Sequence, residues 1–210
     1  MGDNHAPVYS ETAERQRRKY ASRNPVQRFL LRRFFQRIRC WLDEIEPKSV
    51  LDFGCGEGFF WKRLAELGTL PQVTGIDIRR DALAVAREQL PGLTFVEADL
   101  LDFAAPDGTF DLIIASEVLE HLADPGLYLG KLCRVSSRFV LLTVPHEPYF
   151  RLCNLLRGRD LRSLGNHPEH LQRWSRRRFT RFVSQFLMIE KVATSFPFIL
   201  VLGRPRAQEA

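Results

Sequence analysis

Residues 50–58 read Val-Leu-Asp-Phe-Gly-Cys-Gly-Glu-Gly, a short apolar run that leads directly into three alternating glycines. Such a run predicts a buried β-strand that turns sharply into a helix, because glycine lacks the β-carbon that would obstruct the turn. A ligand can then lie directly on the backbone. Asp52 stands at the mouth of this turn, where a carboxylate can hold a cationic or hydrogen-bonding group. Tight strand–helix turns also form for packing reasons alone, so the glycines need support from the rest of the chain.

The spacing of the glycines separates two kinds of cofactor. Dinucleotide-binding loops carry a third glycine three positions after the second, and a pyrophosphate lies at the helix N-terminus. Phe59 occupies the corresponding position here, and the carboxylates of Asp52 and Glu57 would repel a pyrophosphate. A cationic ligand that carries an adenosine and an amino acid suits this loop better. A nicotinamide dehydrogenase is therefore the weakest alternative.

Three further apolar segments end in acidic residues. Residues 73–77 end in Asp77, at roughly the 20-residue distance from the glycines at which an acid meets ribose hydroxyls. The next two segments end at Asp99 and at the pair Ser116 and Glu117. Each acid on its own could be an ordinary surface residue. Parallel strands open at their carboxyl ends onto one crevice where ligands bind, so the ordered set predicts a ligand site at that edge.

These motifs resemble those of class I S-adenosylmethionine-dependent methyltransferases, of the small single-domain type related to ubiquinone-biosynthesis enzymes. The resemblance is close over residues 50–145. The stretches that carry it are 50–58, 75–78, 98–100 and 110–122. It implies S-adenosylmethionine as the methyl donor, S-adenosylhomocysteine as the product, and no metal.

The resemblance also implies a role for each matching residue. Asp52 and the loop backbone would hold the methionine moiety, Asp77 the ribose hydroxyls and Asp99 the adenine amino group. Ile78 would pack on adenine, and the Leu100 amide would meet a ring nitrogen. The complete set implied to bind the cofactor is Asp52, Phe53, Gly54, Cys55, Gly56, Asp77, Ile78, Asp99, Leu100, Ser116 and Glu117. The last two would lie beneath the sulfonium.

Strand and helix patterns alternate along most of the chain. We expect strands at 49–53, 72–77, 93–98, 110–115, 139–144, 187–194 and 197–203. We expect helices at 26–45, 57–67, 81–90, 125–136 and 175–186. The repeated strand–helix units predict an α/β fold with a Rossmann-like, doubly wound, seven-stranded sheet between two helical layers. The short junction at Phe196-Pro197 makes the last two strands a hairpin, so the last strand should run antiparallel to the otherwise parallel sheet.

Length and composition are those of one ordinary domain. The 210 residues suit a single domain over 24–210, preceded by a mobile polar arm over 1–23. No apolar run is long enough for a transmembrane helix, and the N-terminus lacks the apolar core of a signal peptide. The four cysteines form no C-x-x-C pair, which favours reduced thiols in a cytoplasmic protein.

The chain has a formal net charge of +6, with basic residues concentrated in 15–39 and 151–181. Asn24 and Pro25 form a cap and a first turn, and the apolar residues that follow recur at helical spacing opposite several arginines. We expect this helix to lie across the sheet edge and the cofactor pocket. Peripheral contact of a basic amphipathic helix 25–45 with a membrane is the alternative. The basic residues could equally form a solvated face.

Residues 146–174 interrupt the alternation, and we expect them to form a substrate lid. Apolar residues alternate there with arginines, which suits an apolar or lipid-like small-molecule acceptor with an anionic group. The candidate substrate residues are Arg157, Arg159 and Trp174. A lid helix whose arginines face solvent explains the same pattern.

Histidine offers the only candidate catalytic group. His146 follows directly from the fifth strand, beside the crevice, and is the candidate general base, although a lone histidine on a loop is more often structural. His167 and His170 flank a proline and lack cysteine partners nearby, so we expect no metal site.

Methyl transfer is an in-line displacement at a sulfonium, whose leaving group is neutral. The protein therefore mainly aligns the reactants, excludes water and, for a hydroxyl nucleophile, supplies a base. We expect methylation of a small molecule, at oxygen. An RNA methyltransferase is one alternative, favoured by the charge, although Ser116-Glu117-Val118-Leu119 lacks the Asn/Asp-Pro-Pro-aromatic sequence of enzymes that methylate base amino groups. A non-catalytic cofactor-binding subunit is the other, and the intact glycine loop speaks against lost cofactor binding.

Overall fold

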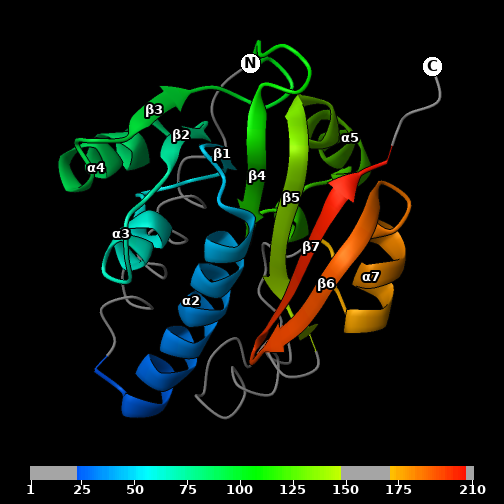
Figure 1. The fold of residues 1–210 in the computed structure, drawn as a ribbon, viewed down its shortest axis with the longest axis horizontal. Helices are drawn as coiled ribbons and strands as arrows, with labels where there is room; N and C mark the ends of the chain where they lie inside the picture. The colour runs from blue at the N-terminus through cyan, green and yellow to red at the C-terminus, as the bar shows by residue number, and fades with distance from the viewer. Residues whose placement is uncertain (1–22, 148–170, 207–210) are drawn as a thin grey trace.

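A seven-stranded sheet lies between two layers of helices in the computed structural model, which describes residues 23–147 and 171–206 (Figure 1). The strands are β1 (Ser49–Phe53), β2 (Gln72–Asp77), β3 (Thr94–Glu97), β4 (Phe110–Ser116), β5 (Ser136–Pro145), β6 (Leu187–Ser195) and β7 (Phe198–Pro205). The helices are α2 (Pro25–Ile45), α3 (Phe59–Ala65), α4 (Arg80–Gln89), α5 (Pro125–Val135) and α7 (Arg176–Val183), with a 3₁₀ turn, η1, at Leu119–His121. Nearly all of the expected arm (1–23) and most of the expected lid (146–174) lie outside the described residues.

The strand order is β3-β2-β1-β4-β5-β7-β6. The first five strands run parallel, and β7 runs antiparallel to both β5 and β6. This confirms the doubly wound α/β sheet and its antiparallel last strand. The sequence did not predict that β7 lies between β5 and β6. All five parallel strands end at the same edge of the sheet, which collects the residues that follow them.

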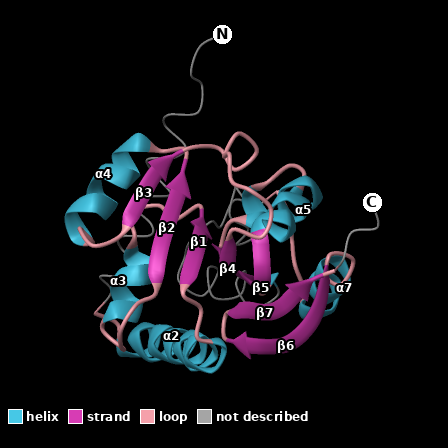
Figure 2. Ribbon diagram, turned by 45° about the horizontal axis from the view of Figure 1, so that its top comes forward, coloured by secondary structure: helices cyan, strands magenta, loops and turns pink. Residues whose placement is uncertain are grey.

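Each face of the sheet has its own apolar core (Figure 2). α2 and α3 cover one face, whereas α5 and α7 cover the other. The expected position of α2 across the sheet edge and the pocket is wrong, since Phe34, Ile38 and Leu42 share a buried cluster with Val50 and Leu200 from the sheet face. The helical stripe is long enough to cover several strands, and burying it there removes most apolar area from water.

The local signals in the sequence explain most helix and strand ends. The Asn24 side chain accepts hydrogen bonds from the N–H groups of Val26 and Gln27, so the predicted cap of α2 is confirmed. α3 begins at Phe59, two residues later than expected, because Gly58 before it has φ 76°. Among the described residues, no helix is both long and apolar enough to cross a membrane.

Gly75 in β2 permits the close approach of two neighbouring segments, and Gly75→Ala tests this. A β-carbon there would lie 2.8 Å from both Cys55 Sγ and Phe95 Cδ1. We expect a loss of about 1–3 kcal/mol in the free energy of unfolding, because the buried side chains of Cys55 and Phe95 would have to move. Gly130→Ala in α5 is the control, since nothing lies within 4 Å of its added carbon. Equal urea midpoints for the two variants would contradict the prediction.

Candidate functional site

The glycine loop after β1 is hydrogen-bonded onto the end of β2. The N–H groups of Gly54 and Cys55 donate to the Ile76 carbonyl at 2.8 and 3.1 Å. The N–H of Gly56 donates to Asp77 Oδ2 at 2.8 Å. Since these N–H groups are used within the protein, they are not free to hold an anion such as a phosphate. A cationic or hydrogen-bond-donating ligand fits such a loop better than an anion.

The backbone of this edge requires glycine at specific positions. Gly54 and Gly56 have φ values of 70° and 54°, in the left-handed region that favours glycine. A β-carbon at Gly54 would lie 2.7 Å from Val118 Cγ2, so the loop also packs closely against the segment after β4. Glu117, in that same segment, has φ 59°, an uncommon conformation for a residue with a side chain. Conformations of this kind cluster at functional sites.

Asp52 lies at the end of β1 with only 2% of its surface exposed. Its Oδ2 accepts a hydrogen bond of 2.8 Å from Trp61 Nε1, in α3. Burial raises the pKa of Asp52 to about 8, and the negative charge of Asp77 raises it further, whereas the hydrogen bond from Trp61 acts in the opposite direction. Asp52 is thus a buried acid, and within residues 23–147 and 171–206 no ion pair compensates its ionised form. A ligand cation beside it would favour ionisation.

The thiol of Cys55 also lies in this loop. Burial raises its pKa, and the negative charges of Asp52 and Asp77 add to the effect. The thiol therefore stays protonated at neutral pH and is no nucleophile. Among the described residues no group of three or more potential metal ligands gathers.

The carboxylate of Asp77 is buried at the end of β2 and faces the glycine loop. Its Oδ1 accepts a hydrogen bond of 2.9 Å from the Arg79 N–H, and Arg79 Nε lies 3.5 Å away. Ile78, next in sequence, has a half-exposed side chain. The loop of β1 and the acid of β2, which the sequence suggested separately, are therefore one connected unit.

Asp99 follows β3 and is oriented by two hydrogen bonds. Its Oδ1 accepts from the N–H of Leu101 at 2.8 Å, and its Oδ2 accepts from the Tyr128 hydroxyl at 3.2 Å. The Tyr128 ring, from α5, also stacks on Phe53 with centroids 5.6 Å apart. Leu100 is fully buried, so only its backbone could meet a ligand. Tyr128 was missed from the sequence, because nothing local connects it to an acid 29 residues away.

Ser116 and Glu117 lie at the end of β4 as expected. The Ser116 hydroxyl is 2.8 Å from the Thr143 hydroxyl, and the N–H of Glu117 donates to the Thr143 carbonyl at 2.9 Å. These contacts fix the end of β4 to the neighbouring strand β5. The chain ends of β1, β2, β3 and β4 thus bring their acids to a single edge.

His146 directly follows β5 at the same edge and is partly buried. The backbone N–H of His146 donates a hydrogen bond of 2.8 Å to the Pro197 carbonyl. Burial lowers the pKa of the imidazole, and the positive charge of Arg176 lowers it further. The ring is therefore neutral at physiological pH, which a general base requires.

The two ends of the expected lid lie together. The N–H of Glu147 donates to the Trp174 carbonyl at 3.0 Å, and the N–H groups of Leu171 and Gln172 donate to the Glu120 carbonyl. The Trp174 ring is buried against Phe179 and Phe182 from α7.

Trp174 thus lies in the apolar core beneath α7, and its substrate contact stays a prediction. The other two candidate substrate residues, Arg157 and Arg159, lie outside the described residues.

Comparison with known proteins agrees with this geometry. The methyltransferase domain family matches residues 46–176, more than half of the chain, and the chain belongs to that family. It is 38% identical over 96 residues to a trans-aconitate 2-methyltransferase of Rhodopseudomonas palustris, covering 44% of this chain and 36% of the relative. It is 39% identical over 88 residues to a ubiquinone biosynthesis O-methyltransferase of Vibrio campbellii, covering 40% and 37%. A malonyl-[acyl-carrier protein] O-methyltransferase of Legionella pneumophila is 34% identical over 115 residues, covering 53% and 40%.

The chain thus spans well under half the length of these relatives. Among solved structures, the magnesium protoporphyrin IX methyltransferase of Synechocystis with bound S-adenosylhomocysteine has a TM-score of 0.68 at 21% identity, covering 93% of this chain and 95% of that one. The plantazolicin methyltransferase BpumL, also with S-adenosylhomocysteine, has a TM-score of 0.68 at 15% identity, covering 95% and 100%. These similarities show the fold.

Asp52→Asn tests the buried acid. Because the folded-state pKa of Asp52 is raised from 3.8 to about 8, the folded protein holds a proton that the unfolded chain releases, and stability falls as the pH rises between these values. The asparagine variant has no such proton, so its stability relative to wild type should increase by about 2 kcal/mol between about pH 5.5 and 7.5. Urea unfolding at both pH values measures the difference.

The exposed acid Asp107 provides the control for this experiment, because its side chain is well exposed to solvent. Asp107→Asn should shift stability equally at both pH values. If Asp52→Asn behaved in the same way, the buried carboxyl would not titrate as described.

Proposed function

We propose that this protein is an S-adenosylmethionine-dependent methyltransferase that acts on a small-molecule acceptor. The observation that carries the proposal is the glycine loop hydrogen-bonded to Asp77 beside the buried Asp52. This arrangement gathers acidic side chains at one edge of the sheet, which suits a cationic adenosyl ligand. Membership of the methyltransferase domain family, and the bound S-adenosylhomocysteine of the two structural neighbours, support it.

The residues present fit this cofactor group by group. The positive charge of the ligand would offset the ionised form of Asp52, which is unfavourable without it. Asp77 accepts hydrogen bonds from the ribose hydroxyls and keeps the loop in place through Gly56. Asp99 accepts from the adenine amino group and is oriented for it by Tyr128. Ile78 offers a half-exposed apolar surface for the adenine ring.

In the proposed reaction the cofactor supplies a methyl group whose leaving group is a neutral sulfide. The protein aligns the acceptor and excludes water. Ser116 and Glu117, fixed to β5 through Thr143, form the floor of the crevice. His146, at the end of β5, takes the proton of an acceptor hydroxyl, and its lowered pKa keeps it neutral for that purpose.

Oxygen is the proposed site of methylation, since two of the relatives are named as O-methyltransferases. The proposed acceptor is an apolar molecule with an anionic group, held by Arg157, Arg159 and Trp174. The described neighbourhood of Trp174 supports an anionic group, because Arg173 and Arg176 beside it are both exposed.

Asp77→Asn tests the cofactor site. Removing the charge weakens two hydrogen bonds to the ribose, and bonds to charged groups contribute about 1.5–3 kcal/mol each. We expect the dissociation constant for S-adenosylhomocysteine, measured by calorimetry, to rise roughly 10- to 100-fold. Asp107→Asn is the matched control and should bind as wild type does, and NADH should not bind to either. Absence of binding to the wild-type protein would overturn the proposed function.

His146→Gln tests the general base. With an acceptor found by screening cell-extract fractions with radiolabelled cofactor, we expect kcat/KM to fall by roughly 10²–10⁴ while cofactor affinity is unchanged. Since burial and Arg176 lower the pKa of His146, the wild-type rate should decline only below the ordinary histidine value of 6.5, where the ring becomes protonated. An unchanged rate and pH profile in His146→Gln would make the residue structural.

A further inference from the structure

The first two turns of α2 expose apolar side chains that a helix on a sheet normally buries. Val26 and Phe29 are 63% and 58% exposed, whereas the buried stripe of the helix begins only at Phe34. Figure 1 shows the start of α2, in blue, extending past the ends of the strands. These two side chains therefore project away from the sheet, and the core does not use them.

Arginines surround the two exposed apolar side chains. Arg28, Arg32 and Arg33 are exposed, and the Arg33 guanidinium lies 5.8 Å from the centre of the Phe29 ring. The sequence from Asn24 to Leu42 contains no acidic residue. Cations near a helix N-terminus are unfavourable for the helix itself, because that end already carries a partial positive charge. An anionic partner would offset this unfavourable arrangement of charge.

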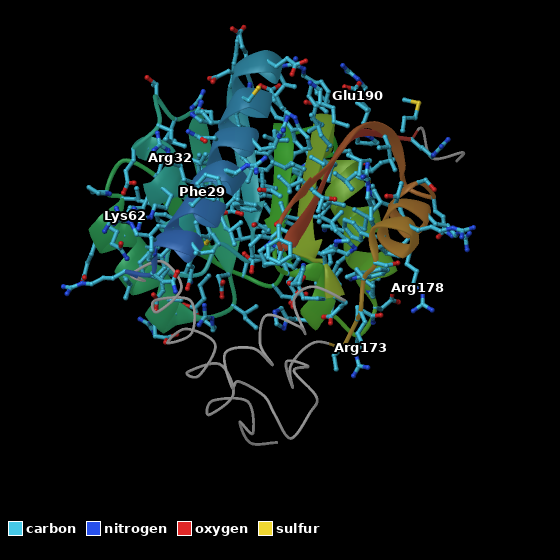
Figure 3. All side chains as sticks on the ribbon, turned by 90° about the horizontal axis from the view of Figure 1, so that it is seen from below. Phe29, Arg32, Lys62, Arg173, Arg178 and Glu190 are labelled. Atoms are coloured by element: carbon cyan, nitrogen blue, oxygen red, sulfur yellow. The ribbon has the colours of Figure 1, made fainter. Side chains whose placement is uncertain are left out.

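A second group of cations lies at the start of α7. Arg176, Arg177 and Arg178 occupy the first three positions of α7, where the helix dipole again disfavours them, and Arg173 precedes them. All four are exposed. Figure 3, which views the molecule from below Figure 1, shows Phe29 and Arg32 on one side and Arg173 and Arg178 on the other. The two groups flank the edge at which β5 ends.

We propose that this surface, here named the basic face, docks onto an anionic lipid bilayer. Its residues are Val26, Arg28, Phe29, Arg32, Arg33, Arg173, Arg176, Arg177 and Arg178. The two apolar side chains enter the interface between headgroups and acyl chains, and the arginines contact the headgroup phosphates.

This proposal narrows the expectation for helix 25–45. From Phe34 onward the apolar stripe is buried in the core, so only the first two turns can meet a membrane. Exposed valine and phenylalanine at the tip favour a bilayer over a nucleic acid, whose phosphate backbone would engage the arginines but would not bury Val26. Docking would bring the strand ends that carry the cofactor site to the membrane surface. An apolar acceptor with an anionic group, as proposed above, would be available there.

Co-sedimentation of the full chain with vesicles tests the proposal. We expect binding to phosphatidylcholine vesicles that contain about a third phosphatidylglycerol, weakening as salt increases, and little binding to phosphatidylcholine alone. Arg28→Gln and Arg32→Gln should each lower the partition coefficient about fivefold, and Phe29→Ser roughly tenfold.

Matched controls lie near the opposite edge of the sheet. Arg134→Gln, at the end of α5, removes an exposed arginine, and Met188→Ser, at the start of β6, removes a half-exposed apolar side chain. Both should bind vesicles as wild type does. S-adenosylhomocysteine affinity, measured in every variant, should not change, because none of these residues lies at the cofactor site. The affinity for S-adenosylhomocysteine therefore distinguishes a loss of docking from a failure of the proposed enzymatic function.

Three outcomes would overturn the proposal. The first is equal binding to neutral and anionic vesicles. The second is equal binding by the basic-face variants and the controls. The third is binding of RNA, lost in Arg28→Gln and Arg32→Gln, by a protein that does not bind vesicles.

Discussion

The hydrogen bonds between the glycine loop and the end of β2 are the constraint on which the rest of the site depends. They require that Gly75 have no side chain, and they bring the Asp77 carboxylate against the N–H of Gly56. The same closure leaves Asp52 buried near a second negative charge. Concentrated, desolvated negative charge is costly in the free protein. It is therefore well suited to a positively charged ligand.

The fold could be predicted because its local signals are strong. Apolar runs with intervening helical periodicity located all seven strands, and Asn24 and Pro25 fixed the start of α2. The position of α2 was wrong, since an apolar stripe identifies the buried side of a helix but not the surface it packs on. The position of β7 between β5 and β6 likewise depends on tertiary packing. The alternation of strands and helices along the sequence does not determine it.

Only part of the site could be predicted from the sequence. Acids at strand ends could be found because parallel strands open onto one edge, and the structure places Asp52, Asp77 and Asp99 there. The groups that orient these acids could not be found from the sequence. Trp61 and Tyr128 resemble ordinary core residues, and only folding brings the first to Asp52 and the second to Asp99. These neutral donors decide how each carboxylate is held, and so determine what the edge can bind.

The central claim is that this edge holds an adenosyl sulfonium. Amide hydrogen exchange of the full chain, with and without saturating S-adenosylhomocysteine, tests it directly. The account predicts slower exchange with the ligand in the loop after β1 and in the segments that follow β2, β3 and β4, while the N-terminal turns of α2 are unchanged. Exchange rates at those strand ends that the ligand does not alter would contradict it.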